Sequence, residues 1–326
     1  MPKCTICGKR FDTLSSLREH HRAVHPNSKF VAPKTRLTRN LVVGMILVLI
    51  VVGGLVGYAI YLQSQQNDTN GNSGLLNTPI SPTLYQNLTG VSFQTLSAIG
   101  PSQSLITYPS SKWTSISTTT TLTSNGKAEI LYIGAEFCPY CAAERWSMVV
   151  ALSKFGNFSN LEYMASALGD GDIATLSFRD ATYSSPYNLT LVTVENQDRN
   201  HQTLQTPTTA EQQLWNQYNA NSYPFIDIGG QYVLKTSQFD FGDLSNLNWS
   251  QIGSQLNNPQ SNIAKAIDGA ANQFMGAICK IDGSQPSSIC GQSFASLSFH
   301  PSSQSSNLPL FLMQVSYEER VKSIAV

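Results

Sequence analysis

Two cysteine pairs in this sequence share the spacing C-x-x-C but lie in different surroundings. The first is CTIC, from Cys4 to Cys7, and the second is CPYC, from Cys138 to Cys141, within ILYIGAEFCPYCAAER. This spacing serves both tetrahedral metal binding and thiol–disulfide exchange. The residues around each pair therefore have to indicate which chemistry it performs.

The first pair belongs to a set of zinc-ligand type with the spacing C-x2-C-x12-H-x4-H: Cys4, Cys7, His20 and His25. Two thiolates on a turn and two imidazoles on one helix face suit tetrahedral Zn²⁺. Phe11 and Leu17 would supply the small core, and zinc binding the folding free energy. Residues 1–28 resemble a ββα C2H2 zinc finger. His21 also has a permitted spacing to His25, but its position relative to Leu17 is less favourable than that of His20.

The sequence indicates the metal of this finger more specifically than it indicates the finger's role. A single finger reads about 3 bp, and the positions that would face bases, Thr13, Ser16 and Glu19, include no arginine. Basic side chains could contact phosphates or anionic lipid: Lys9, Arg10, Arg18 and Arg22. Contact with a cytoplasmic protein or a purely structural role is favoured, and nucleic acid remains an alternative partner.

The second pair lies where a predicted strand, Glu129 to Phe137, meets a predicted helix that starts at Cys138 and ends near Phe155. At the helix N-cap, free amide groups and the helix dipole would stabilise a Cys138 thiolate, and Pro139 suits the first turn. Cys141, one turn later, could resolve a mixed disulfide. No further Cys or His pair has ligand spacing here, which disfavours zinc, while a purely structural disulfide remains an alternative.

A second stretch supports exchange chemistry. NSYPFIDIGGQYVL, from Asn221 to Leu234, is a Tyr-Pro followed by a strand, a Gly-Gly turn and another strand. Together with AEFCPYC it resembles the thioredoxin superfamily. The resemblance implies that Pro224 is cis and that the Tyr223 backbone pairs with a bound peptide or mixed disulfide.

The sequence departs from that superfamily at Tyr132, where thioredoxins have a buried aspartate. Glu136 or Glu144 could instead act on Cys138 if folding brings either close. The predicted domain is α/β and thioredoxin-like with an insertion, from about Leu168 to Asn219, that contains a helix at 209–218.

The layout from Pro79 to Gly291, including LSFRDATYSSPYNLTLVTVEN, also resembles an archaeal, Sulfolobus-type family of membrane-anchored domains of unknown function. That resemblance implies a thioredoxin-like fold and no established substrate.

Leu41 to Leu62 has no charged residue and is long enough to cross the roughly 30 Å hydrocarbon layer as a helix. The first 39 residues carry about seven net positive charges, and no Lys or Arg follows the apolar segment before Lys112. The positive-inside rule therefore predicts a single-pass membrane protein with a cytoplasmic N-terminus and an extracellular C-terminal domain. Five N-x-S/T sequons fall on that outer side: Asn67, Asn87, Asn157, Asn188 and Asn248.

These features divide the chain into consecutive segments. The zinc finger (1–28) is followed by a basic juxtamembrane segment (29–40), the membrane helix (41–62), a flexible stalk (63–83), the outer domain (84–300) and an unplaced tail (301–326). Cys279 and Cys290 close a Gly- and Pro-containing loop and are predicted to form a structural disulfide, with a second redox pair as the alternative.

The predicted function is a membrane-anchored thiol–disulfide oxidoreductase that acts on protein or peptide thiols and disulfides outside the cell, with Zn²⁺ in the finger only. One alternative is a non-catalytic thioredoxin-like surface or adhesion module, and another is a membrane-tethered zinc-finger redox sensor. Charged residues make up only 12% of the chain. Because few carboxylates have to be protonated, the outer domain is predicted to suit an acidic environment.

Overall fold

The computed structural model describes residues 1–32, 53–54, 74–104, 112–116, 122–294 and 299–303. The chain divides into two units, 1–66 and 67–326. Among the described residues, no helix combines the length and the hydropathy needed to cross a bilayer. Apart from residues 53 and 54, the predicted membrane helix (41–62) lies outside the described residues.

Within residues 1–32, the N-terminal unit forms a turn followed by one helix. Cys4 and Lys9 are joined by a backbone hydrogen bond of 2.8 Å, and Lys3 and Arg10 form an antiparallel bridge. Helix α1 (Leu14–Val24) follows, with Thr13 as its N-cap. Leu17 is the buried apolar residue on this helix, as predicted.

Seven described strands of the second unit form one sheet with the order β11-β1-β10-β9-β3-β2, and β8 also pairs with β3. Their bounds are β1 (Trp113–Ser115), β2 (Thr123–Ser124), β3 (Lys127–Gly134), β8 (Leu189–Glu195), β9 (Phe225–Ile228), β10 (Tyr232–Leu234) and β11 (Ser302–Ser303). β8 is parallel to β3, whereas β9 is antiparallel to both β3 and β10. The sheet is therefore mixed, and β3 pairs with β9, β8 and β2.

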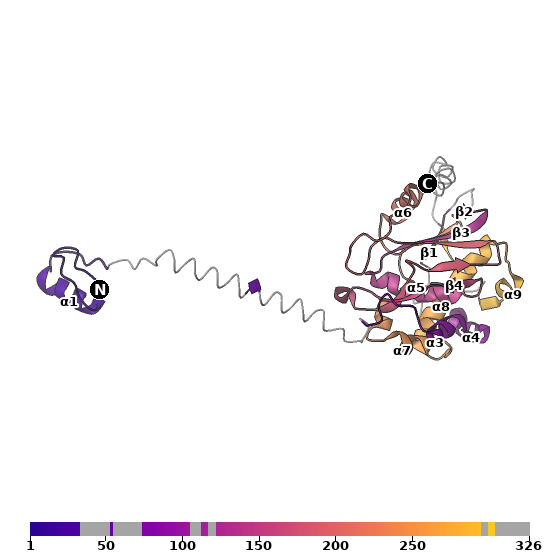
Figure 1. The fold of residues 1–326 in the computed structure, drawn as a ribbon, viewed down its shortest axis with the longest axis horizontal. Coiled ribbons are helices and arrows are strands. Elements are labelled where there is room, and N and C mark those ends of the chain that lie inside the picture. Colours follow the sequence, from indigo (N-terminus) through magenta and orange to yellow (C-terminus); the bar gives the residue numbers. More distant parts are fainter. Residues whose placement is uncertain (33–52, 55–73, 105–111, 117–121, 295–298, 304–326) are drawn as a thin grey trace. The chain divides into compact units, whose positions relative to one another are not determined.

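Helices cover both faces of this sheet (Figure 1). They are α3 (Pro82–Thr89), α4 (Phe93–Gln103), α5 (Pro139–Leu152), α6 (Thr209–Asn219), α7 (Trp249–Gly253), α8 (Asn262–Ile281) and α9 (Ser287–Cys290), with short 3-10 helices η1 (Leu168–Asp170) and η2 (Phe241–Leu244). Ile130 and Tyr132 of β3 belong to the larger core with α5 and α8, while Leu131 and Ile133 pack with Trp215 of α6. This alternation is what a strand buried on both faces requires.

Several elements predicted from the residues at their ends are formed in the structure. The helix predicted at 209–218 is α6, which begins with a capping box between Thr208 and Glu211. The Gly-Gly turn joins β9 to β10, and Gly229 and Gly230 have φ of 64° and 68°, which glycine adopts without steric cost. The hairpin after Pro224 is therefore formed as predicted.

The predicted insertion needs correction. β8 lies inside the predicted range, from about Leu168 to Asn219, yet it pairs with β3 along its whole length in the main sheet. The strands outside the main sheet lie between α5 and β8 in the chain. They form two small antiparallel pairs: β4 (Asn157–Ser159) with β7 (Thr182–Ser184), and β5 (Glu162–Ala165) with β6 (Ala174–Ser177). The hydrophobic pattern of β8 could not show which strand it would pair with.

Both predicted ends of the outer domain also shift. The predicted stalk, 63–83, includes residues that fold onto the domain, because the amide groups of Asn77 and Ile80 donate to Tyr163 and Leu161 at 2.9 and 3.0 Å. At the other end, β11 pairs with β1 beyond residue 300. The rest of the predicted tail, 304–326, lies outside the described residues.

Candidate functional site

The CPYC pair lies where β3 leads into α5. Cys138 is the N-cap of this helix and Pro139 occupies its first turn, as predicted. The amide of Cys141 donates a hydrogen bond to the Cys138 sulfur at 3.3 Å. Both cysteines are free thiols, Cys138 with 4% of its surface exposed and Cys141 with none.

These positions give the two thiols opposite acidities. The hydrogen bond with the Cys141 thiol lowers the pKa of Cys138, and the amide groups of Tyr140 and Cys141 and the charge of Arg145 act in the same direction, against burial. Burial raises the pKa of Cys141 well above its usual range. One thiol is therefore prepared to ionise near the surface while the other stays protonated beneath it.

A buried ion pair lies beside the cysteines. Arg145 of α5 and Glu195 at the end of β8 are both fully buried and are joined by hydrogen bonds of 2.9 and 2.7 Å. Arg145 also donates to the carbonyl of Ala135 at 2.8 Å. Ala135 packs directly against Cys138 and Cys141.

Tyr223 and Pro224 lie near the same pair. The Tyr223–Pro224 peptide bond is cis, as the thioredoxin resemblance implies. The Tyr223 side chain packs on the cluster of Ala135, Cys138 and Cys141, and its hydroxyl donates to Asn196. Burial, together with the nearby cysteines, raises the pKa of Tyr223 to about 12, so it remains a neutral donor.

Aromatic rings surround the exposed side of the motif. Phe137 stacks on His201 with ring centroids 3.9 Å apart and meets Tyr223 at 5.8 Å. Tyr140, in the middle of CPYC, is 45% exposed and packs against Phe241 of η2 at 4.9 Å. His201 is thus exposed, and its ring packs on Phe137 beside the cysteines.

The two glutamates proposed from the sequence are engaged elsewhere. Glu136 accepts a hydrogen bond from Ser177 at 2.7 Å, and burial raises its pKa. Glu144 accepts from the backbone and the side chain of Gln238 at 2.9 and 2.8 Å. Neither carboxylate is among the causes of the lowered pKa of Cys138, which are the hydrogen bonds with Cys141, the charge of Arg145 and the backbone amide of Tyr140.

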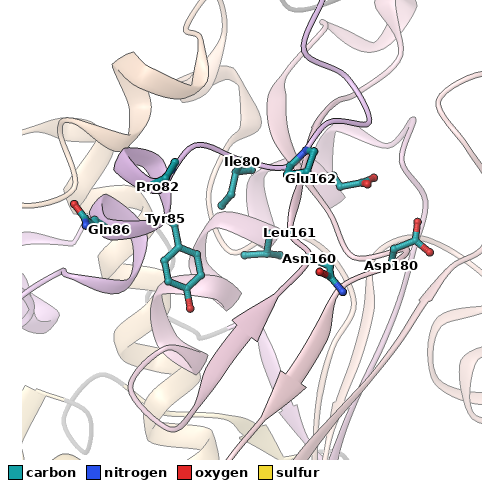
Figure 2. A pocket seen from close by; sticks show the side chains of 9 residues that line it. Ile80, Pro82, Tyr85, Gln86, Asn160, Leu161, Glu162 and Asp180 are labelled. Carbon is teal, nitrogen blue, oxygen red and sulfur yellow. The ribbon is translucent and has the colours of Figure 1, made fainter.

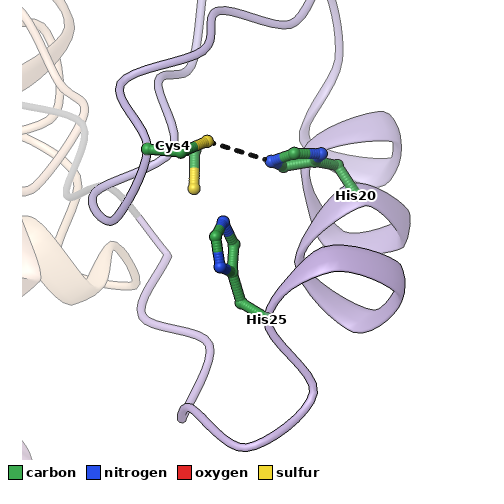
Figure 3. Close-up of side chains that lie close together, drawn as sticks. Cys4, His20 and His25 are labelled. Atoms are coloured by element: carbon green, nitrogen blue, oxygen red, sulfur yellow. Dashed lines mark hydrogen bonds between the residues drawn. The ribbon is translucent and has the colours of Figure 1, made fainter.

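The N-terminal unit brings a second group together. The ligand-type atoms of Cys4, Cys7, His20 and His25 all lie within 4.8 Å of one another (Figure 3). The buried Nε2 of His25 has no hydrogen-bond partner in the protein, as expected of a nitrogen that binds a metal. Backbone amides of Cys7 and Ile6 lower the pKa of Cys4, and burial lowers that of His20, so both favour the metal-binding protonation state. The four residues form a candidate metal-binding group that fits tetrahedral zinc.

His21, the alternative ligand, points elsewhere. It is buried, contacts the Ser28 hydroxyl at 3.2 Å and packs edge-on against Phe30 at 5.2 Å. His20 is instead 3.2 Å from the Cys7 sulfur. The choice of His20 from its spacing to Leu17 agrees with this arrangement.

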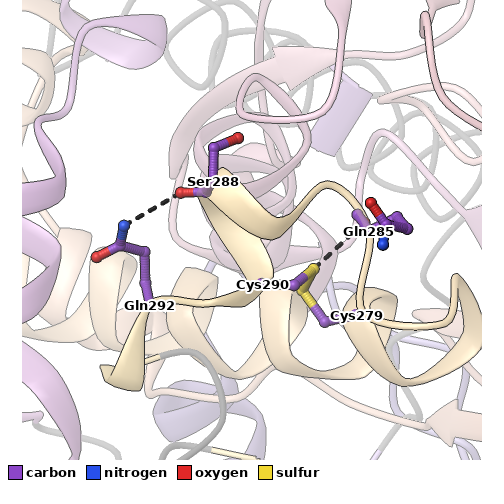
Figure 4. Close-up of a disulfide and its surroundings, with 5 residues drawn as sticks. All are labelled: Cys279, Gln285, Ser288, Cys290 and Gln292. Carbon is purple, nitrogen blue, oxygen red and sulfur yellow. Dashed lines mark hydrogen bonds between the residues drawn. A yellow bond between two sulfur atoms is a disulfide. The ribbon is translucent and has the colours of Figure 1, made fainter.

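The third pair of cysteines is oxidised. Cys279 at the end of α8 and Cys290 in α9 form a disulfide with their Cα atoms 5.5 Å apart (Figure 4). Gln292 donates to the Ser288 carbonyl at 3.1 Å and holds the turn after α9. The predicted pairing of Cys279 with Cys290 in a disulfide is confirmed.

A separate pocket of about 540 Å³ opens where the chain enters α3 (Figure 2). It is lined by Pro79, Ile80, Pro82, Tyr85, Gln86, Asn160, Leu161, Glu162 and Asp180. Glu162 in its wall is neutralised by Arg179 at 2.8 Å. None of the predicted site residues lines this pocket.

Residues 114–280 match the model of a family described as Domain of unknown function (DUF929). The chain belongs to this family. The DUF929 region contains both cysteines of CPYC, the Tyr223–Pro224 bond and the Arg145–Glu195 pair, and it excludes the metal-binding group. No curated protein and no solved structure matches the chain.

The sequence gives only a weak signal for Arg145 within the DUF929 region. It is the one cation in a largely apolar helix that also contains Glu144, and it lies four residues after Cys141, which is the spacing of neighbours on one helix face. Glu195 closes an apolar strand in the same way. Their pairing depends on β8 lying beside β3, which no local pattern predicts.

Proposed function

We propose that the DUF929 domain of this chain is a thiol–disulfide oxidoreductase with Cys138 as the nucleophile and Cys141 as the resolving thiol. The observation that carries the proposal is the asymmetry of the pair: one thiol at the helix N-cap with a lowered pKa, and one fully buried with a raised pKa. A disulfide that only braces the fold does not need such a difference.

In the proposed exchange, the Cys138 thiolate attacks one sulfur of a substrate disulfide. The S–S bond of the substrate breaks, a mixed disulfide forms, and the first substrate sulfur leaves as a thiolate. Cys141 then loses its proton and attacks the Cys138 sulfur, which releases the second substrate thiolate. Two electrons pass to the substrate, and Cys138–Cys141 becomes a disulfide; the reverse sequence oxidises a substrate dithiol.

A thioredoxin-like fold is part of this proposal. The run β10-β9-β3-β8, with β8 parallel and β9 antiparallel to β3, supports it, as does the position of CPYC between β3 and α5. The aromatic rings of Tyr140 and Tyr223 beside Cys138 suit a polypeptide substrate with apolar side chains. Fold similarity alone does not establish an activity, so the cysteine chemistry has to be measured.

The first experiment is the reduction potential of Cys138–Cys141 in the full-length protein, by thiol trapping and peptide mass spectrometry across a redox buffer series. We expect a value between about −120 and −270 mV, the range of disulfide exchangers. A pair that is not reduced before the protein unfolds would contradict the proposal and favour a non-catalytic surface module. The Cys279–Cys290 peptides in the same samples provide the internal control for a structural disulfide.

We also propose that residues 41–62 anchor the protein in the cell membrane, with the DUF929 domain outside. The uncharged segment and the preceding cluster of Lys and Arg support this topology. Protease added to intact cells should remove the outer domain and leave an N-terminal epitope tag protected. Loss of the tag under the same conditions would contradict this orientation.

For the N-terminal unit we propose zinc binding and contact with a cytoplasmic protein. Several apolar side chains on this small unit are exposed: Met1, Ile6, Leu14, Val24 and Val31. Thr13 and Ser16, which would face DNA bases, bind each other through their hydroxyl groups at 2.5 Å. Capture by the tagged full-length protein, with and without a zinc chelator, should show a zinc-dependent protein partner and no nucleic acid.

A further inference from the structure

Arg145 is a fully buried cation next to a pair of thiols, and the exchange reaction described above does not use it. It lies on α5, four residues after Cys141 and seven after Cys138, so the three side chains share one side of the helix. A buried ion pair is generally no more stabilising than apolar side chains of the same size. The position of this charge therefore needs a reason other than stability.

Arg145 is connected to the nucleophile through one carbonyl group. It donates to the Ala135 carbonyl at 2.8 Å, and the backbone amide of Cys138 donates to the same oxygen at 3.2 Å. The guanidinium group thereby fixes the turn that presents Cys138 at the start of α5. A shift of Arg145 would move this turn directly.

The titratable groups around Arg145 include Glu195, Tyr132 and the buried Glu136, besides the two cysteines. Glu195 pairs with it through both carboxylate oxygens and also accepts from the amide of Phe178 at 3.2 Å. Tyr132 lies beside it, with its ring centroid 5.8 Å from the guanidinium carbon and its buried hydroxyl without a partner in the protein. The remaining buried nitrogen of Arg145, Nη1, has no hydrogen-bond partner.

The charge of Arg145 acts on both thiols: it contributes to the lowered pKa of Cys138 and opposes the effect of burial on the pKa of Cys141. Glu195 carries the opposite charge and is paired with the guanidinium group at 2.7 Å. A negative charge at this position disfavours a nearby thiolate, so removing Arg145 and removing Glu195 should have opposite effects on Cys138, although both residues belong to the same ion pair.

We propose that Arg145 is a positioning residue that holds the Cys138 turn and favours the thiolate of Cys138, with Glu195 limiting the strength of its charge. The inference rests on the proposed oxidoreductase function and extends it to the control of that site. A stabilised thiolate favours the dithiol state of the pair, which makes its disulfide a stronger oxidant.

The test uses full-length protein with Cys141→Ser, so that Cys138 is a free thiol whether or not the native pair is redox-active. The rate of Cys138 alkylation is measured against pH by peptide mass spectrometry, in this background and with Arg145→Gln or Glu195→Gln added. Arg145→Gln should lower the thiolate-to-thiol ratio about tenfold at a given pH, equivalent to one pKa unit. Glu195→Gln should raise this ratio.

The decisive result is that Arg145→Gln and Glu195→Gln change the thiolate-to-thiol ratio of Cys138 in opposite directions. Both substitutions break the same ion pair, so if that pair had only a structural role, both would shift the titration of Cys138 in the same direction. Arg145→Lys should keep the ratio close to that of the background. If Glu195→Gln does not fold, the apolar double variant Arg145→Met/Glu195→Leu replaces it and should have a higher thiolate-to-thiol ratio than Arg145→Gln, in which the carboxylate of Glu195 remains without its partner. The proposal would be overturned if the two substitutions shifted the titration of Cys138 equally, or if Arg145→Gln did not shift it. Failure of the oxidoreductase function would appear separately, in the reduction potential of the native Cys138–Cys141 pair.

Discussion

At the scale of single residues, Cys138 and Cys141 differ in access as well as in acidity. Cys138 has a small exposed surface at the helix start, whereas Cys141 is enclosed by Ala135 and the rest of α5. A substrate disulfide can therefore reach only the first sulfur without unfolding of the site. The order of attack in the proposed exchange follows from this geometry.

The Cys141→Ser variant should accumulate a mixed disulfide on Cys138 when the full-length protein is incubated with oxidised glutathione, because no resolving thiol remains. Cys138→Ser, the matched control, should form little adduct on Cys141, whose thiol is buried and has a raised pKa. Peptide mass spectrometry distinguishes these sites from Cys4 and Cys7. Equal adduct formation on the two cysteines would contradict the assigned roles.

Among the histidines of the N-terminal unit, His20 and His21 are neighbours with different surroundings. His20→Ala should abolish stoichiometric zinc binding because it removes one of four ligands. His21→Ala should retain zinc and lose only the packing against Phe30. Zinc content of the purified full-length variants, measured by elemental analysis, checks both outcomes, and zinc loss in His21→Ala alone would reverse the ligand assignment.

At the scale of elements, the disulfide joins the end of the long helix α8 to α9. It closes a loop with a sequence separation of 11 residues, which in the chain-entropy description stabilises the folded state by about 2–3 kcal/mol. Cys279→Ala/Cys290→Ala should lower the free energy of unfolding by about this amount, measured by denaturant titration. The reduction potential of Cys138–Cys141 should not change, and a clear change would support electron relay between the two pairs instead.

The elements also show which parts of this fold local sequence can predict. The start of α5 at Cys138, the capped start of α6 and the hairpin turn at Gly229 all depend on residues next to one another, and each was predictable. The pairing of β8 with β3 and the folding of residues 77–80 onto the domain depend on contacts between distant segments. The metal group was predictable because its ligands lie close in sequence, whereas the Arg145–Glu195 pair spans 50 residues.

At the scale of the whole molecule, the DUF929 domain contains few charged groups but buries several carboxyl groups. Asp227 on β9 and Glu144 on α5 are fully buried, and burial raises the pKa of each to about 7. Asp268 on α8 is also buried, and both its oxygens lack hydrogen-bond partners, so its pKa is raised as well. These carboxyl groups are therefore mostly protonated, and so uncharged, at acidic pH.

Because the pKa values of these carboxyl groups are raised in the folded domain, its free energy of unfolding depends on pH. In the unfolded chain such carboxyl groups have pKa values near 4. Below that pH they are protonated in both the folded and the unfolded state, so they do not change the free energy of unfolding. As the pH rises from about 4 to above 7, the unfolded state ionises first and the folded state loses relative stability. The structure therefore supplies a second physical reason, besides the low number of carboxylates, for the acidic environment expected from the sequence.

Thermal unfolding of the full-length protein should accordingly show the DUF929 domain more stable at pH 4 than at pH 8. Glu144→Gln keeps a group that can still hydrogen-bond near Gln238 and cannot ionise, and Asp227→Asn does the same beside Gly230. Each substitution should reduce the difference in unfolding free energy between the two pH values, by up to about 3 kcal/mol for a shift of this size. Glu162→Gln, at a partly exposed carboxylate paired with Arg179, is the matched control and should leave the difference nearly unchanged. A domain that is less stable at pH 4 than at pH 8, with or without these substitutions, would show that the buried carboxyl groups do not determine its response to acid.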